Sequence, residues 1–328
     1  MLNLKSVLKY LFLFCMGIGI LYLAFKDQNL GQIWAEIKNA NFLWVALSAI
    51  SVWIAHVLRA LRWRMLFHSI NYNVTFWNTY HAVIIGYLAN LALPRFGEIG
   101  RCSVMLKSEK VPMFASIGTV ITERLFDMFM LLLSALLMLI FQYDLVSDFL
   151  FNSIYVNIAA KIHSINYLWS IVLIVLILCI ILAAIYFIRK ALNKKFLRIY
   201  VGLKQGFNSY SNLQNKSLFI TYTLGIWVFY FSSMYLAFSA IQATSGLGLN
   251  VGFTALVFSS FAMVAPVQGG LGVFHWMVAQ ALVLYAVPFK DGLAYATILH
   301  SSQFLLTIIL GCLSLLLVFS KRIKTNHI

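Results

Sequence analysis

The sequence predicts an all-α polytopic membrane protein, built as an inverted repeat of two halves with six full spans and two broken, re-entrant helical hairpins. Of its 328 residues, 62% are hydrophobic and 10% are charged, which is too apolar for a soluble domain. Long apolar stretches recur along the chain, and a short pattern rich in Pro and Gly occurs twice. The two copies are PRFGEIG at 94–100 and PVQGGLG at 266–272, 172 residues apart. We expect a single transmembrane domain over 1–328.

Six apolar stretches are long enough to cross a hydrocarbon core of ~30 Å, which takes about 20 helical residues. They lie at 5–25, 42–67, 113–141, 165–188, 217–241 and 292–319. The first has Lys5 and Lys9 at its start and resembles a signal peptide, but no A-x-A-like cleavage site follows it. We therefore expect it to remain as the first span.

Two further apolar regions, 75–107 and 252–287, each contain one copy of the Pro and Gly pattern. Pro lacks an amide donor and Gly does not bias the backbone, so each copy is expected to form a non-helical tip between two helices. Each region is either a re-entrant hairpin or a pair of spans. Helices broken at matching points of two halves are typical of the binding site of a transporter.

The net charge of +15 comes from basic residues that gather between the apolar spans. This distribution is typical of cytoplasmic loops and not of a nucleic-acid-binding surface. The segment 189–216 is basic and amphipathic, so it is expected to lie on the cytoplasmic leaflet. The loops at 26–40, 142–163 and 242–250 are near neutral or acidic and are expected outside, which places both termini in the cytoplasm.

Shifting the first half by 172 residues superposes its spans and its tip on those of the second half. The halves are repeat 1, about 1–141, and repeat 2, about 164–320. Their equivalent loops, 26–40 and 189–216, fall on opposite sides of the membrane by charge. The repeat is therefore predicted to be inverted.

Three charged residues, Glu123, Arg124 and Asp127, fall near the middle of the span at 113–141. Each charge costs ~2.5 to 3.5 kcal/mol at that depth. Residues three and four apart share a helix face, so the group can point together into the protein. Two interpretations stay open: a role in substrate binding or coupling, and structural pairing with Arg95 and Arg101.

The first tip carries Arg95, Glu98 and Arg101 among backbone amides freed by its Pro and Gly residues. A helix starting after Gly97 would direct its positive end into the site, which suits a phosphate. The alternative is that Arg95 and Arg101 anchor the chain at the cytoplasmic interface. Asn90, just before the tip, can bond the freed backbone.

The arginines at the end of the second span are predicted to be anchors at the cytoplasmic interface. They are Arg59, Arg62 and Arg64.

The second tip has no charge and offers Gln268, Gly269, Gly270 and, one turn further, His275. An unperturbed histidine titrates near neutral pH, so His275 could exchange protons. It could equally be a hydrogen-bonded packing residue. The same two interpretations apply to the histidines of other apolar stretches, His56, His81 and His300.

The four cysteines form no CxxC pair and no metal-binding spacing with histidine, so neither a disulfide framework, a metal nor a cofactor is expected. The sequence has no GxxxxGK[ST], HExxH, GxSxG or DxD pattern. The sequence therefore favours a transporter over an enzyme.

The motif NLALPRFGEIGR at 90–101, followed by ERxxD at 123–127 and PxxGGLGVF at 266–274, resembles the flippase-like family named for the transmembrane region of lysylphosphatidylglycerol synthase. The resemblance covers nearly the whole chain. It implies an integral protein of the bacterial plasma (inner) membrane that moves a lipid or a lipid-linked anionic group between leaflets. The residues that it singles out are Arg95, Glu98, Arg101, Glu123, Arg124 and Asp127.

The chain departs from this family at two points. His275 stands where the family often has Glu, and no soluble synthase domain follows residue 320, so the chain is not expected to attach lysine to lipid itself.

Our hypothesis is translocation of an anionic phospholipid or lipid-linked intermediate. In it Arg95, Arg101 and Arg124 hold the phosphate, and the three acids Glu98, Glu123 and Asp127 balance charge or exchange protons. One alternative is a membrane transferase that uses a polyprenyl-phosphate donor. Another is an accessory partner of a separately encoded lipid-modifying enzyme.

Overall fold

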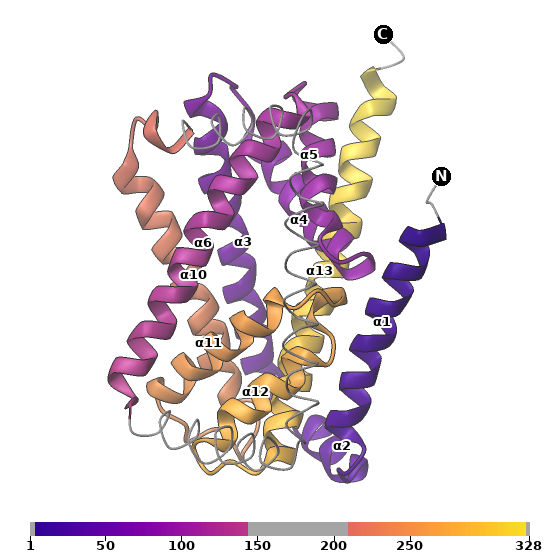
Figure 1. The fold of residues 1–328 in the computed structure, drawn as a ribbon, viewed down its shortest axis with the longest axis vertical. Coiled ribbons are helices and arrows are strands. Elements are labelled where there is room, and N and C mark those ends of the chain that lie inside the picture. Colours follow the sequence, from indigo (N-terminus) through magenta and orange to yellow (C-terminus); the bar gives the residue numbers. More distant parts are fainter. Residues whose placement is uncertain (1–3, 144–208, 326–328) are drawn as a thin grey trace, which may run out of the picture.

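The computed structural model describes residues 4–143 and 209–325, and every regular element in this part is helical (Figure 1). Four helices are long and apolar enough to cross a membrane, and they match four of the expected spans. They are α3 (Phe42–Ser69), α6 (Met113–Phe141), α10 (Lys216–Phe238) and the Phe289–Val318 part of α13 (Phe289–Thr325). The chain is thus a multi-pass membrane protein.

The N-terminal helix α1 (Leu4–Phe25) coincides with the first expected span. Its part Phe12–Phe25 is apolar but shorter than the four spanning helices. The expected span at 165–188 and most of the segment 189–216 lie outside the described residues. A count of six full spans therefore stays a prediction. The loop expected at 26–40 contains a short helix, α2 (Leu30–Lys38), which starts where the Asn29 side chain accepts the backbone N–H groups of Gly31 and Gln32.

Each Pro and Gly pattern lies at the tip of a helical hairpin. The first hairpin consists of α4 (Phe76–Ala92) and α5 (Phe96–Ser108), and the second of α11 (Leu249–Val264), the short 3-10 helix η2 (Gln268–Gly270) and α12 (Val273–Val283). At 1.5 Å per residue these arms are about 16 to 25 Å long, shorter than a ~30 Å hydrocarbon core. The lengths favour two re-entrant hairpins over two pairs of spans.

The hairpins approach from opposite ends of the molecule and their tips meet (Figure 1). A Cβ placed on Gly269 would lie 2.9 Å from Leu91 Cδ2. Arg95 Nη2 donates to the carbonyl oxygen of Val264 at 3.5 Å. The two halves of the sequence are thus in contact at their helix breaks.

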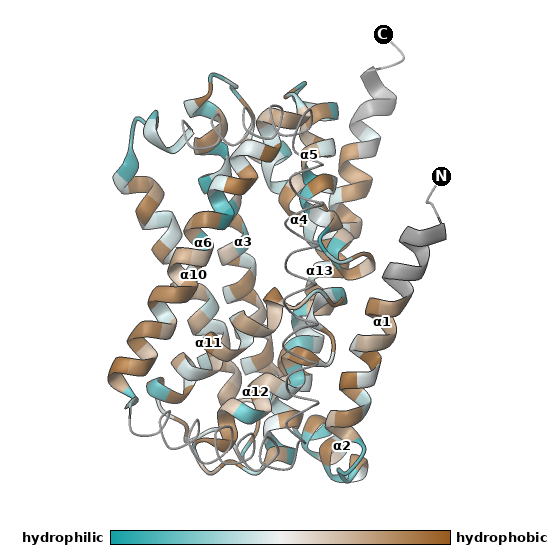
Figure 2. Ribbon diagram, in the orientation of Figure 1, coloured by the Kyte–Doolittle hydropathy of each residue, from teal (hydrophilic) through white to brown (hydrophobic). Residues whose placement is uncertain are grey.

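Helices α3 and α10 pack along each other more extensively than other helix pairs of the described chain. The hydroxyl of Ser48 on α3 donates to the carbonyl of Ser233 on α10 at 2.9 Å. The long helices consist largely of hydrophobic residues (Figure 2). Many of these residues are exposed, among them Phe141 at the end of α6 at 75%. Such a surface suits hydrocarbon, where each backbone polar group must be satisfied within its helix.

Candidate functional site

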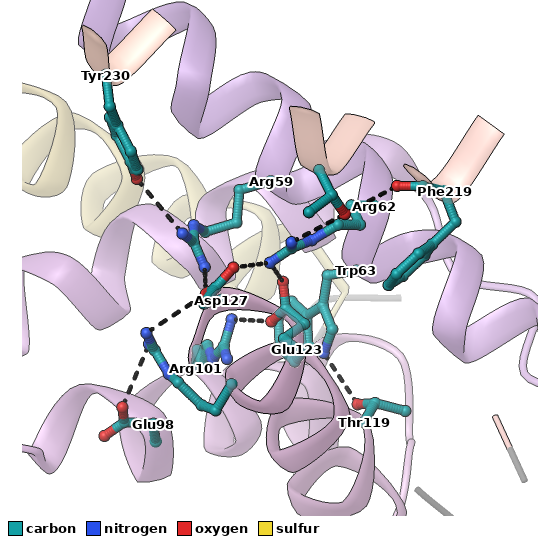
Figure 3. Close-up of polar contacts among 12 residues, drawn as sticks. Arg59, Arg62, Trp63, Glu98, Arg101, Thr119, Glu123, Asp127, Phe219 and Tyr230 are labelled. Carbon is teal, nitrogen blue, oxygen red and sulfur yellow. Dashed lines mark hydrogen bonds and ion pairs between the residues drawn. The ribbon is translucent and has the colours of Figure 1, made fainter. Parts of the chain in front are cut away.

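The acids of α6 point into the protein and meet arginines of two other helices (Figure 3). Glu123 is fully buried, and the side chain of Asp127, one turn later, is 15% exposed. Both lie in the middle third of α6, as the sequence predicts. At this depth an unpaired carboxylate would be costly, so its partners decide whether the helix can be inserted.

Two of these partners are Arg59 and Arg62 of α3, and their prediction as interfacial anchors is wrong. Arg62 is fully buried, with Nη2 at 2.7 Å from Asp127 Oδ1 and 3.3 Å from Glu123 Oε1. Arg59 is 5% exposed, and its Nη1 lies 2.6 Å from Asp127 Oδ2. Because α3 packs along α10, this part of α3 lies inside the bundle, where both arginines are buried.

One further nitrogen of each arginine reaches α10. Arg62 Nη1 donates to the Thr223 hydroxyl at 3.2 Å, and Arg59 Nη2 to the Tyr230 hydroxyl at 3.5 Å. Only Arg64, at the end of the group, faces away from the acids: it is partly buried and its Nε donates to the carbonyl of Val74 at 3.0 Å.

Arg101 of α5 completes the buried group. Its Nη1 lies 2.7 Å from Glu123 Oε2, and its guanidinium carbon lies 4.4 Å from the centroid of the Trp63 ring. Trp63 is itself held by a hydrogen bond from its indole N–H to the Thr119 hydroxyl at 2.9 Å. The structure therefore brings Arg101 and Glu123 together, as the structural alternative for these residues requires.

A second, more open ion pair lies beside this group. Arg124 is 45% exposed and its Nη2 lies 3.2 Å from Glu98 Oε1, while its Nη1 is 3.8 Å from Asp127 Oδ2. Glu98 is 31% exposed. Water or a ligand can reach this pair far more readily than the buried ions.

The charges do not balance. We define the arginine cluster as the three buried arginines Arg59, Arg62 and Arg101 with the two acids Glu123 and Asp127. It carries one positive charge in excess, and the neighbouring Arg124 and Glu98 cancel each other. An excess positive charge inside an apolar bundle attracts an anion strongly because the surrounding dielectric is low.

The first tip is built by a close helix crossing. A Cβ on Gly97 would collide with the carbonyl oxygen of Gly86, and the Gly97 N–H donates to the Asn90 side chain at 2.7 Å. Asn90 thus bonds the freed backbone as expected, and α5 begins at Phe96, one residue before Gly97. Arg95 takes a left-handed conformation (φ 61°) and is exposed. Its side chain reaches the Val264 carbonyl of the second tip and not the acids of α6.

The second tip forms a separate polar group. The His300 Nε2–H donates to the carbonyl of Gly269 at 2.8 Å, and the ring of His275 meets that of His300 edge-on at 4.8 Å. His275 and Gln268 are buried, and Gly270 has a positive φ of 78°. These predicted site residues are gathered at one tip, where the hydrogen bond from His300 holds the Gly269 backbone.

Sequence reasoning missed that Arg59 and Arg62 belong to the site. The available signal was their spacing of three, which puts both on one face of α3 together with His56, another buried polar residue of this helix. Polar residues that share one face of a span indicate a buried face.

The fold and site define a class: a multi-pass helical membrane protein with two facing broken hairpins and an ion cluster within the bundle. The chain matches the family model described as the lysylphosphatidylglycerol synthase TM region over residues 6–311, and it belongs to this family. A comparison with curated proteins gave no match, and a comparison with solved structures gave none.

Proposed function

We propose that this protein moves an anionic phospholipid or a lipid-linked anionic intermediate between the leaflets of a bacterial plasma membrane. The observation that carries the proposal is the arginine cluster: buried ions with one uncompensated positive charge, beside the meeting point of two broken hairpins. Broken helices that converge inside a membrane bundle are typical of transporters. The family is named for the membrane region of an enzyme of lipid modification, which fits a lipid substrate.

In this proposal the predicted inverted repeat supplies the mechanism. Under the 172-residue shift α3 corresponds to α10 and α6 to α13, and α3 and α10 pack against each other as a pseudo-two-fold axis between them would require. Rocking of the halves would open the cluster to each leaflet in turn. Helix α1 begins on the side where α13 ends, which supports placing both termini on one face, the cytoplasmic one (Figure 1).

In this scheme the open ion pair of Arg124 and Glu98 receives the headgroup first. A lipid phosphate can replace the Glu98 carboxylate on Arg124 because both are oxyanions. The buried ions then stabilise the anion inside the bundle.

The test is leaflet exchange in proteoliposomes. Fluorescent phosphatidylglycerol and phosphatidylcholine are incorporated, and the fraction in the outer leaflet is followed with a membrane-impermeant quencher. We expect exchange of the anionic lipid by the wild type, a loss of about tenfold or more in Arg124→Gln, and none in the matched control Arg64→Gln. Folded wild-type protein that exchanges neither lipid faster than empty liposomes would overturn the proposal.

A further inference from the structure

Arg101 uses only one side of its guanidinium. Its Nη1 pairs with Glu123, whereas Nε and Nη2 are buried and have no hydrogen-bond partner within 4–143 and 209–325. Buried donors without a partner are uncommon in proteins and each needs an explanation. Arg101 itself is 4% exposed, so bulk water does not satisfy them.

The other two arginines of the cluster differ from Arg101 in this respect. Both terminal nitrogens of Arg59 are hydrogen-bonded, one to Asp127 and one to Tyr230. Both terminal nitrogens of Arg62 are also hydrogen-bonded, one to Thr223 and one to the two acids of α6. Each retains only Nε without a partner. Arg101 is therefore the one cluster arginine in the described chain with a whole edge free.

That edge has a specific chemistry. Nε and Nη2 lie side by side in the guanidinium plane, and their two parallel N–H groups match two oxygens of a phosphate or carboxylate. The Trp63 ring, 4.4 Å from the guanidinium carbon, fixes the orientation of this plane. A lysine offers a point charge but no such pair of donors.

The charge of the cluster limits the ligand. One positive charge is in excess, so a single negative charge gives neutrality, whereas a dianion leaves a buried negative charge. A phosphodiester carries one negative charge and presents two free oxygens. A phosphomonoester with its second proton lost carries two charges.

Apolar surface beside the site points to a lipid as the source of this group. Phe96 and Ile99 on α5 are 40% and 48% exposed, and Met263 and Val264 at the second tip are 56% and 58% exposed. Val264 touches Arg95 across the two tips. Acyl chains can therefore lie along the tips while the headgroup reaches α5.

We propose that the Nε/Nη2 edge of Arg101 is the receptor for the phosphodiester of a glycerophospholipid whose net charge is minus one. This inference rests on the proposed lipid translocation and specifies which headgroup chemistry the site selects. The described conformation is the occluded one, because both nitrogens are shielded from the surface. Glu98 lies on α5 with Arg101, and Arg124 lies on α6 with Glu123. Separation of Arg124 from Glu98 would therefore open a path to the two buried nitrogens of Arg101.

The test measures lipid binding without transport. The full chain in detergent is titrated with phosphatidylglycerol, phosphatidylcholine and phosphatidic acid, and bound lipids are counted by native mass spectrometry. The variants are Arg101→Lys, which keeps the charge but loses the paired edge, and Arg64→Lys as the matched control. Arg101→Gln is a second variant, in which the remaining ions of the cluster are two arginines and two acids, so that a balanced core should fold.

We expect the wild type to prefer phosphatidylglycerol over both other lipids, and the preference to fall by about tenfold or more in Arg101→Lys and Arg101→Gln, the range for losing charge-assisted hydrogen bonds. Arg64→Lys should keep it. Folded Arg101 variants with the wild-type preference would overturn the inference. Competition by soluble glycerophosphoglycerol as strong as by the lipid would overturn the lipid source.

This outcome is separable from the proposed function. A protein that binds phosphatidylglycerol through Arg101 but exchanges no lipid supports the receptor and overturns only translocation. Exchange of anionic lipid that persists in Arg101→Lys with unchanged headgroup preference supports translocation and overturns the receptor.

Discussion

Arg62 Nη2 lies 2.7 Å from Asp127 Oδ1, and this ion pair joins α3 to α6 in the interior of the bundle. The same nitrogen also reaches Glu123, so one guanidinium holds both acids of α6. Neither helix could bury its charges alone at this depth. The cluster thus joins three helices and carries one positive charge in excess, and the ligand that we propose for this charge can be tested separately from the structural role.

Replacing Arg62 should destabilise the fold strongly. Arg62→Met removes one partner of two buried carboxylates, and breaking a buried pair from one side costs about 3 to 5 kcal/mol. The measurement is thermal unfolding in detergent micelles. The matched control is Arg64→Met, which loses a single bond to the Val74 carbonyl and should unfold near the wild-type temperature. Equal unfolding temperatures for the two variants would contradict a structural role for Arg62.

Gly97→Ala should disrupt the first hairpin. The added Cβ would collide with the Gly86 carbonyl and lie 2.7 Å from Asn90, and both neighbours belong to a packed helix crossing. Gly100→Ala is the matched control on the same helix, because its Cβ would meet only Ala89 Cβ at an ordinary 3.6 Å. Membrane-inserted yield and unfolding temperature should fall for Gly97→Ala alone. Tolerance of both substitutions would show that the crossing is looser than described.

The sequence predicts the spans and the tips because hydrophobic length, Pro and Gly are local signals. The span predicted at 113–141 is α6 residue for residue, and Asn90 bonds the backbone at the first tip as predicted. The loop expected at 26–40 contains the helix α2, which was not predicted from the sequence. Its nine residues are too few to give a clear helical pattern in the sequence. Local patterns therefore identify long apolar helices better than short helices.

The partners within the site are not local. Which arginine meets Glu123 depends on how α3, α5 and α6 pack, and positive charge near a span end also predicts an interfacial anchor. Arg59 and Arg62 were assigned wrongly for this reason, while Arg64, two residues on, does point to a loop carbonyl. The structural alternative paired Arg95 with the acids of α6. Arg95 instead donates to the backbone of the second tip.

Contact between the two tips predicts a cross-link. Cysteines replacing Arg95 and Val264, in a chain whose native cysteines are replaced, should be joined by a short bifunctional thiol reagent in membranes. The control pairs Arg95→Cys with Asn250→Cys, about 20 Å away along α11, and should not react. Cross-linking of the control pair, or of neither pair, would contradict tips that meet inside the bundle.

The Gln142 side chain links the far end of α6 to the second hairpin by hydrogen bonds, beside the apolar contact between Met138 and Val257. Gln142, just after α6, donates from Nε2 to the Asn250 carbonyl at 3.3 Å. Its Oε1 accepts from the Thr254 hydroxyl at 2.7 Å and from the Tyr285 hydroxyl. These hydrogen bonds must break if α6, which carries Glu123 and Asp127, separates from the second hairpin on that side.

Gln142→Ala should therefore favour opening of that side. Each lost hydrogen bond is worth about 1 kcal/mol, so the open population should rise by about tenfold or more. A cysteine at the buried Ser134 of α6 reports opening through its labelling rate with a membrane-impermeant thiol reagent. The matched control is Tyr143→Ala, whose side chain is 68% exposed and whose loss should leave the rate unchanged. If Gln142→Ala labels no faster than Tyr143→Ala, the Gln142 hydrogen bonds do not control access of the reagent to position 134. The halves would then have to separate elsewhere.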